Sequence, residues 1–158
     1  MVRTISISAW FYIFLAAAIL LIPFHGLAAA VMAAVTHEIY HLLALSLCGV
    51  QVLNIQIGAL GAKIQTEPMT AVQELICAAA GPVGSFSLLL VSDYLPLAAV
   101  FGVAQGVFNL LPAYPLDGGR ILCAILSLIS PRWGMQCGRW IGYGISFLLI
   151  ATAFRLWR

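Results

Sequence analysis

The sequence predicts an all-α polytopic membrane protein with about five transmembrane segments, one of them broken, and a small interfacial β-hairpin. Composition is the first observation: 63% of the 158 residues are hydrophobic, 8% are charged, and the mean hydropathy is +1.08. A soluble domain is about 45–50% apolar and about 25% charged, so this chain has too few charges to cover a water-facing surface. The second observation is that the apolar residues form runs of roughly 20, which is long enough to cross a bilayer.

The charge balance and the cysteines exclude other classes of protein. A net charge of +2 without a Lys/Arg cluster excludes nucleic acid as a partner and leaves the lipid bilayer as the expected surroundings. The cysteines are dispersed through apolar stretches and form no C-x-x-C pair, so they are typical of small buried side chains. The length fits a single domain over 1–158.

The first two spans are predicted on either side of a turn. The stretch "PFHG" at 23–26 interrupts an uncharged run, which places one span at 6–22 and the next at 27–48. A signal peptide cleaved after residue 30 is the alternative. Cleavage there would leave the second span at the new terminus, so we favour two spans.

Residues 50–66 are predicted to form the hairpin. Gln51, Asn54 and Gln56 are interspersed with apolar residues, and "GALGA" at 58–62 resembles a turn. A plain interfacial loop is the alternative. Open strand edges are not tolerated facing lipid, so a hairpin must lie at the interface or against protein.

The remaining elements follow a similar apolar pattern, with one interruption. The stretch "NLLPAYPLDGGR" at 109–120 holds two prolines and two adjacent glycines, which predicts an unwound segment inside a helix. Non-helical backbone at membrane depth occurs only where it is buried in protein or lines a wet cavity. The predicted helices are 71–92, 95–111, 118–130 and 138–155.

The span at 27–48 carries ionisable groups in an otherwise apolar run. His37 and His41 are four positions apart, which puts both on one helix face. Two imidazoles so placed can share a Zn²⁺ ion at about 2.0–2.1 Å each. Glu38 completes the pattern H-E-x-x-H, in which a carboxylate beside the ligands can take a proton from water. Ionisable groups within a span are costly and usually functional, so we favour a metal site over a chance match.

A catalytic zinc needs a third protein ligand, and the sequence offers few candidates. Asp117 alone is predicted at membrane depth, in the unwound "PLDGG". Its alternative role is to cap the helix that follows, which does not exclude ligation. The other candidates are predicted at interfaces, at a span end or in a turn: Glu67, Glu74, Asp93 and His25.

Three motifs together resemble a known family. "HEIYH" (37–41), "AGPVGS" (80–85) and "NLLPAYPLDGGR" (109–120) are similar to those of the site-2 proteases, the M50 intramembrane zinc metalloproteases. The likeness covers essentially the whole chain, with the motifs in the family's order. It is greatest to the compact bacterial group that includes the sporulation-factor processing protease. H-E-x-x-H is weakly specific, whereas the third motif in a membrane segment is strongly specific.

The resemblance implies that His37, His41 and Asp117 hold one Zn²⁺ per chain and that Glu38 is the general base. Carried over by position, Asn109 helps to hold the substrate or the oxyanion; its alternative is a polar helix-packing residue. Ser85 stands where the family's G-P-x-x-N motif has asparagine, so a substrate contact there would have to use a hydroxyl. We expect no PDZ or CBS domain, which many family members carry.

The implied substrate is a transmembrane or membrane-associated protein, cut within or near a membrane segment in a multi-pass protein of the bacterial cytoplasmic membrane. The hairpin with Gln51, Asn54 and Gln56 would clamp the unwound substrate as an added strand. A regulatory membrane protein is a possible further partner. Two alternatives stay open: a zinc-binding or zinc-transporting membrane protein, and an inactive family member that only binds transmembrane partners.

Overall fold

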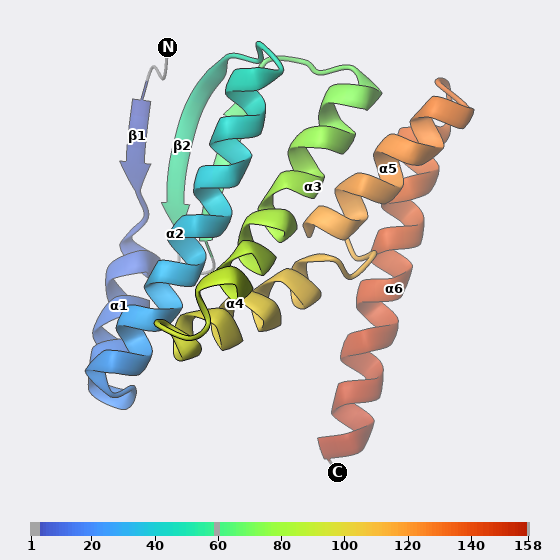
Figure 1. Ribbon diagram of the computed structural model, residues 1–158. Helices are drawn as coiled ribbons and strands as arrows, with labels where there is room; N and C mark the ends of the chain where they lie inside the picture. Colours follow the sequence, from blue (N-terminus) through green and yellow to red (C-terminus); the bar gives the residue numbers. More distant parts are fainter. Residues whose placement is uncertain (1–3, 59–60, 158) are drawn as a thin grey trace.

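The computed structural model describes residues 4–58 and 61–157 and combines a helical bundle with a small sheet (Figure 1). The strands are β1 (Thr4–Ile7), β2 (Val52–Gly58) and β3 (Gly61–Thr66). The helices are α1 (Ala9–Leu21), α2 (Phe24–Leu47), α3 (Ala71–Ser87), the 3-10 turn η1 (Leu88–Val91), α4 (Pro96–Asn109), α5 (Asp117–Ile129) and α6 (Gly134–Trp157). In Figure 1, α2 and α3 lie side by side, the sheet lies next to α2, and α5 and α6 lie on the far side of α3.

Among the described residues, three helices are long and apolar enough to cross a membrane: α2, α3 continued through η1, and α6. The expectation of about five spans is not confirmed, because α1 and α4 are shorter apolar helices. The first predicted span, 6–22, is shortened at its start. Residues Thr4–Ile7 form strand β1, and Ser8 caps the helix that begins at Ala9.

The predicted hairpin is confirmed, but it belongs to a sheet of three strands in the order β1-β2-β3. Strand β2 pairs antiparallel with β3, and β1 adds in parallel on its other side, with Ile5 opposite Ile55. Strand β2 is therefore the central strand, and its main-chain groups pair on both sides. Val52 of β2 and Ile64 of β3 pack against the buried cluster of Ala44, Leu45 and Cys77, which anchors the sheet on α2 and α3.

Glycines bring the helices to short distances from one another. A Cβ built on Gly84 of α3 would lie 2.5 Å from Cγ of Tyr40 on α2. One on Gly102 of α4 would lie 2.6 Å from the carbonyl oxygen of Ser85. On α6, a Cβ at Gly138 would lie 2.7 Å from Sγ of Cys123 on α5. Small residues at such positions let helix backbones approach closely, as is common between membrane helices.

The predicted break between α4 and α5 is confirmed, and it folds back onto the start of α5. A Cβ on Gly118 would lie 2.2 Å from the carbonyl oxygen of Leu110, and one on Gly119 would lie 2.7 Å from that of Ala113. Only glycine leaves room for this contact between the connecting segment and the first turn of α5. The packing fixes where that turn, and with it Asp117, lies relative to α2 and α3.

We expect Gly102→Ala to destabilise the protein, because its new methyl group would meet the backbone of α3. Overpacking of this kind costs about 1–3 kcal/mol. Gly144→Ala is the matched control, since nothing lies within 4 Å of a Cβ built at that helical position. Thermal unfolding of the two variants in detergent should show a lower midpoint for Gly102→Ala only. An unchanged midpoint for Gly102→Ala would contradict the packing of α3 on α4.

Candidate metal centre

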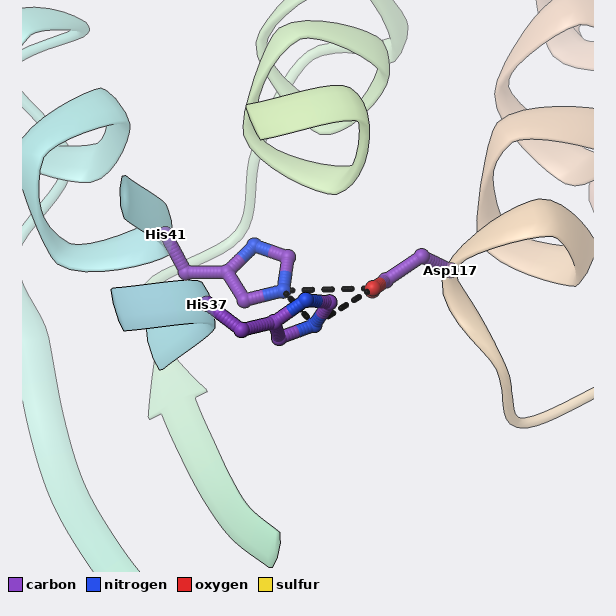
Figure 2. A group of neighbouring side chains, drawn as sticks. All are labelled: His37, His41 and Asp117. Carbon is purple, nitrogen blue, oxygen red and sulfur yellow. Dashed lines mark hydrogen bonds and ion pairs between the residues drawn. The ribbon is translucent and has the colours of Figure 1, made fainter. Parts of the chain in front are cut away.

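His37 and His41 lie one turn apart on α2 and present their rings to the same point (Figure 2). The ring centroids are 4.7 Å apart at an interplanar angle of 82°, and the two Nε2 atoms are 3.1 Å apart. Both side chains belong to the buried face of α2, with His37 3% and His41 7% exposed. The helical spacing of four residues therefore brings together two nitrogen atoms that can bind one metal ion.

Asp117, the first residue of α5, reaches the same point from the opposite side (Figure 2). Its Oδ2 atom lies 3.1 Å from Nε2 of His37 and 3.2 Å from Nε2 of His41. The side chain is buried, and this oxygen has no hydrogen-bond partner among the described residues. Two helices that are distant in sequence thus supply three ligand atoms within 4.8 Å of one another, the only such His/Cys/Asp/Glu group in the described part of the chain.

The hydrogen bonds on the far sides of the two rings allow a neutral ring to carry its proton away from this point. Nδ1 of His41 lies 2.7 Å from the carbonyl oxygen of Cys77, which can only accept, so a neutral ring carries its hydrogen on Nδ1. Nδ1 of His37 lies 2.8 Å from Oγ of Ser85, which can accept in the same way. This assignment leaves a lone pair on each Nε2 atom. Two imidazole lone pairs and a carboxylate oxygen then face one another, an arrangement that a cation stabilises.

The spacing of the donor atoms suits zinc. Tetrahedral coordination at about 2.0–2.1 Å separates neighbouring ligand atoms by about 3.3–3.4 Å. The three separations here are 3.1, 3.1 and 3.2 Å, within a few tenths of that value. Two histidines and one carboxylate are also the kind of three-ligand set that catalytic zinc sites use, with the fourth position left for water or substrate.

Gly81 leaves the space in which the three ligands meet. A Cβ built on this residue of α3 would lie 2.2 Å from Nε2 of His41 and 2.7 Å from Nε2 of His37. Any side chain here would therefore occupy the space in which a metal ion shared by these three side chains would lie. Gly81 and Ser85 belong to the motif "AGPVGS" at 80–85, so one face of α3 both opens this space and contacts His37.

Glu38 lies beside the ligand group but outside it. It follows His37 on α2, and its Oε1 accepts a hydrogen bond of 3.3 Å from the backbone N–H of Ala62 in β3. A Cβ on Gly61 would lie 3.5 Å from the same oxygen. The start of strand β3 therefore contacts the Glu38 carboxylate and orients it beside the candidate metal ligands.

The other predicted site residues lie in different surroundings. Ser85 is fully buried, and its hydroxyl lies 2.8 Å from Nδ1 of His37. The amide of Asn109 donates to the carbonyl oxygen of Gln105 within α4. Gln51 precedes the central strand β2, whereas Asn54 and Gln56 are part of it, and Oδ1 of Asn54 is buried without a partner among the described residues. Among the described residues, no hydrogen bond joins the side chains of these three residues to His37, His41 or Asp117.

Sequence reasoning missed the surroundings of Asp117. The sequence places Glu74 at the interface, yet its Oε1 accepts a hydrogen bond of 2.8 Å from Nε of Arg120. Nη1 of Arg120 in turn lies 3.4 Å from Oδ1 of Asp117. The small number of charged residues was the signal that could have indicated these contacts. The chain has 12 charged residues in 158, and a charge in an apolar helix usually has a partner.

The chain is similar in sequence to a peptidase family and to two zinc metalloproteases. The family model described as peptidase family M50 matches residues 68–153. A zinc metalloprotease of Methanocaldococcus jannaschii is 34% identical over 107 residues, covering 59% of this chain and 32% of that protein. A provisionally named zinc metalloprotease of Synechocystis sp. is 33% identical over 135 residues, covering 74% of this chain and 36% of that protein. The chain thus spans about a third of the length of the curated relatives it matches.

A solved structure shares the fold over nearly the whole chain. The site-2 protease from Methanocaldococcus jannaschii superposes with a TM-score of 0.74 at 28% sequence identity. The match covers 99% of this chain and 82% of that one. The likeness therefore includes both the helices that carry the ligand group and the sheet beside them.

We expect Gly81→Ala to abolish stoichiometric metal binding, because the added methyl group lies within 3 Å of both Nε2 atoms. The loss in zinc affinity should be about 100-fold, the upper end of the range seen when residues packed against metal ligands are changed. Zinc content after purification in detergent measures the effect, and Gly144→Ala is the control for an equivalent methyl group in open space. Wild-type zinc content in Gly81→Ala would show that the metal does not bind between these residues.

Proposed function

Because the chain belongs to peptidase family M50, we propose that it is an intramembrane zinc metalloprotease that hydrolyses a peptide bond in or near a membrane segment of another protein. The family match and the solved site-2 protease confirm the resemblance seen in the motifs. The observation that carries the proposal is the convergence of His37, His41 and Asp117 in the apolar interior, with Glu38 next in sequence to a ligand.

The proposed chemistry divides between a metal ion and one carboxylate. One Zn²⁺ per chain, held by His37, His41 and Asp117, would supply Lewis acidity that polarises the scissile carbonyl and acidifies water. Glu38 accepts the proton of the attacking water at its carboxylate and delivers it to the nitrogen of the leaving amine. The backbone N–H of Ala62 donates a hydrogen bond to the Glu38 carboxylate and would keep it oriented for this proton transfer. Asn109 has one amide hydrogen beyond its bond to Gln105, and this hydrogen is available to the oxyanion.

The sheet suits the presentation of an extended substrate. A helical segment hides its peptide bonds, so the substrate must unwind before attack. The outer edge of β3 can pair with such a chain, and β3 begins at the residues that contact Glu38. Strand β2 is paired on both sides, so Gln51, Asn54 and Gln56 would contact a substrate through their side chains only.

The fold supports a multi-pass placement in a membrane. Three helices are long enough to cross, and α1 together with the broken α4–α5 pair would complete about five membrane-embedded segments. We place the protein in the cytoplasmic membrane of a bacterium. Its substrate is a transmembrane or membrane-associated protein, and a second membrane protein can regulate access to the site.

Glu38→Gln tests the mechanism directly. The amide keeps the shape of the side chain but cannot accept the proton of water, so cleavage should fall by about 10²–10⁴-fold. The measurement is the cleavage of tagged single-span membrane proteins co-expressed with each variant. Glu67→Gln is the matched control, since it removes the same charge from an exposed position outside the site. Zinc content should be unchanged in both variants.

A substrate that is cut equally by the wild type and by Glu38→Gln would contradict the role of Glu38. Asp117→Ala provides a second measurement that needs no substrate. Loss of zinc is expected there, because removal of one of three ligands leaves two histidines on a single helix turn. Full zinc content in Asp117→Ala would remove the aspartate from the metal site.

A further inference from the structure

Helix α3 contacts both proposed histidine ligands directly and is linked to Asp117 through Arg120. Glu74, Cys77, Gly81 and Ser85 follow one another at intervals of three, four and four residues, which puts them on one face of the helix. Cys77 accepts a hydrogen bond from His41 through its carbonyl oxygen, and Ser85 contacts His37 through its hydroxyl. Glu74 lies at the end of the same row, toward Asp117.

The contact from Glu74 to Asp117 passes through Arg120. Arg120 lies one turn after Asp117 on α5 and donates from Nε to Oε1 of Glu74 at 2.8 Å. Its Nη1 lies 3.4 Å from Oδ1 of Asp117. The guanidinium is thus held mainly by Glu74, and its other edge is directed at the carboxylate oxygen that does not face the histidines.

Asp117 needs such a partner because of its place in the fold. It opens α5, where backbone N–H groups are unpaired and attract carboxylates. The residue before it, Leu116, provides no side-chain cap for these groups. Without Arg120 the Asp117 carboxylate can turn toward them, and Oδ2 would then leave the point shared with His37 and His41.

The ion pair of Glu74 with Arg120 also limits the net positive charge near Asp117. A lone guanidinium beside Asp117 would oppose a cation held by the same carboxylate, since like charges repel strongly where the dielectric constant is low. Glu74 neutralises Arg120 at 2.8 Å. The guanidinium can therefore orient Asp117 while adding little net positive charge near the metal ligands.

We propose that Glu74 and Arg120 are positioning residues for metal binding, which hold Oδ1 of Asp117 so that Oδ2 faces Nε2 of His37 and His41. This inference rests on the metal site of the proposed function. It predicts that the pair acts on zinc affinity as one unit, without contact with the substrate.

The test compares Glu74→Gln, Arg120→Lys and the double variant with the wild type in detergent. Zinc dissociation constants come from competition with a chelator, and the visible absorption of bound Co²⁺ reports coordination geometry. Each single change should weaken zinc binding by about 10-fold, because lysine lacks the planar fork and glutamine lacks the charge. The double variant should bind zinc no more weakly than the single variant with the lower zinc affinity, as expected for residues that act through one contact.

Proteolysis at saturating zinc gives the second readout. The single variants should regain most of the wild-type rate there, whereas Glu38→Gln should not. Glu67→Gln and Arg132→Lys are matched controls at exposed positions and should leave both zinc affinity and the Co²⁺ spectrum unchanged. Glu74→Gln preserves the side-chain shape, so it provides the answer if Arg120→Lys does not fold.

Three outcomes would overturn all or part of the inference. Wild-type zinc affinity and an unchanged Co²⁺ spectrum in Glu74→Gln and Arg120→Lys would refute the positioning role, and the proposed function would stand if Asp117→Ala still loses zinc. A wild-type protein that binds no zinc would refute the proposed function itself and the inference with it. Additive losses in the double variant would show that the two residues act separately.

Discussion

Three hydrogen-bond acceptors converge on one point in an apolar interior, and the rest of the structure depends on holding them there. Nε2 of His37, Nε2 of His41 and Oδ2 of Asp117 are within 3.2 Å of one another. Such atoms repel unless a cation binds between them or protons intervene. The carbonyl oxygen of Cys77 holds the hydrogen of a neutral His41 ring on Nδ1, so the lone pair of its Nε2 atom faces the other two groups. The three side chains therefore form a group that could hold a metal ion.

Helix α3 gives this site its shape, although it supplies none of the three ligands. Its glycines admit the side chains of α2: Gly81 leaves space at the histidine nitrogens, and Gly84 packs on Tyr40. The hydroxyl of Ser85 and the carbonyl oxygen of Cys77 orient the rings of His37 and His41. Loss of an orienting contact of this kind typically weakens metal binding by about 10–100-fold. The motif "AGPVGS" at 80–85 thus acts mainly on the packing and orientation of the ligands.

Charge is scarce in this chain and is concentrated at the site. Three of its 5 acidic residues, Glu38, Glu74 and Asp117, lie in or around the ligand group. Each has a partner: Ala62 for Glu38, Arg120 for Glu74, and the two histidines together with Arg120 for Asp117. A charge buried in a membrane protein is costly unless it is paired. The contacts that pair these charges are also the contacts that hold the three side chains of the ligand group together.

The sequence by itself determined the features that depend on local spacing. The interval between His37 and His41 sets two imidazoles on one helix face, and the prolines and glycines of 109–120 break a helix just before Asp117. The alternation at 50–66 predicts the hairpin. Tertiary structure decided what depends on contacts between distant segments. Strand β1 forms because β2 offers an edge, which shortens the first predicted span, and Ser85 meets His37 because α3 packs against α2. Glu74 reaches Asp117 across 43 positions of sequence only when α3 and α5 pack together through Arg120, and no local periodicity encodes that contact.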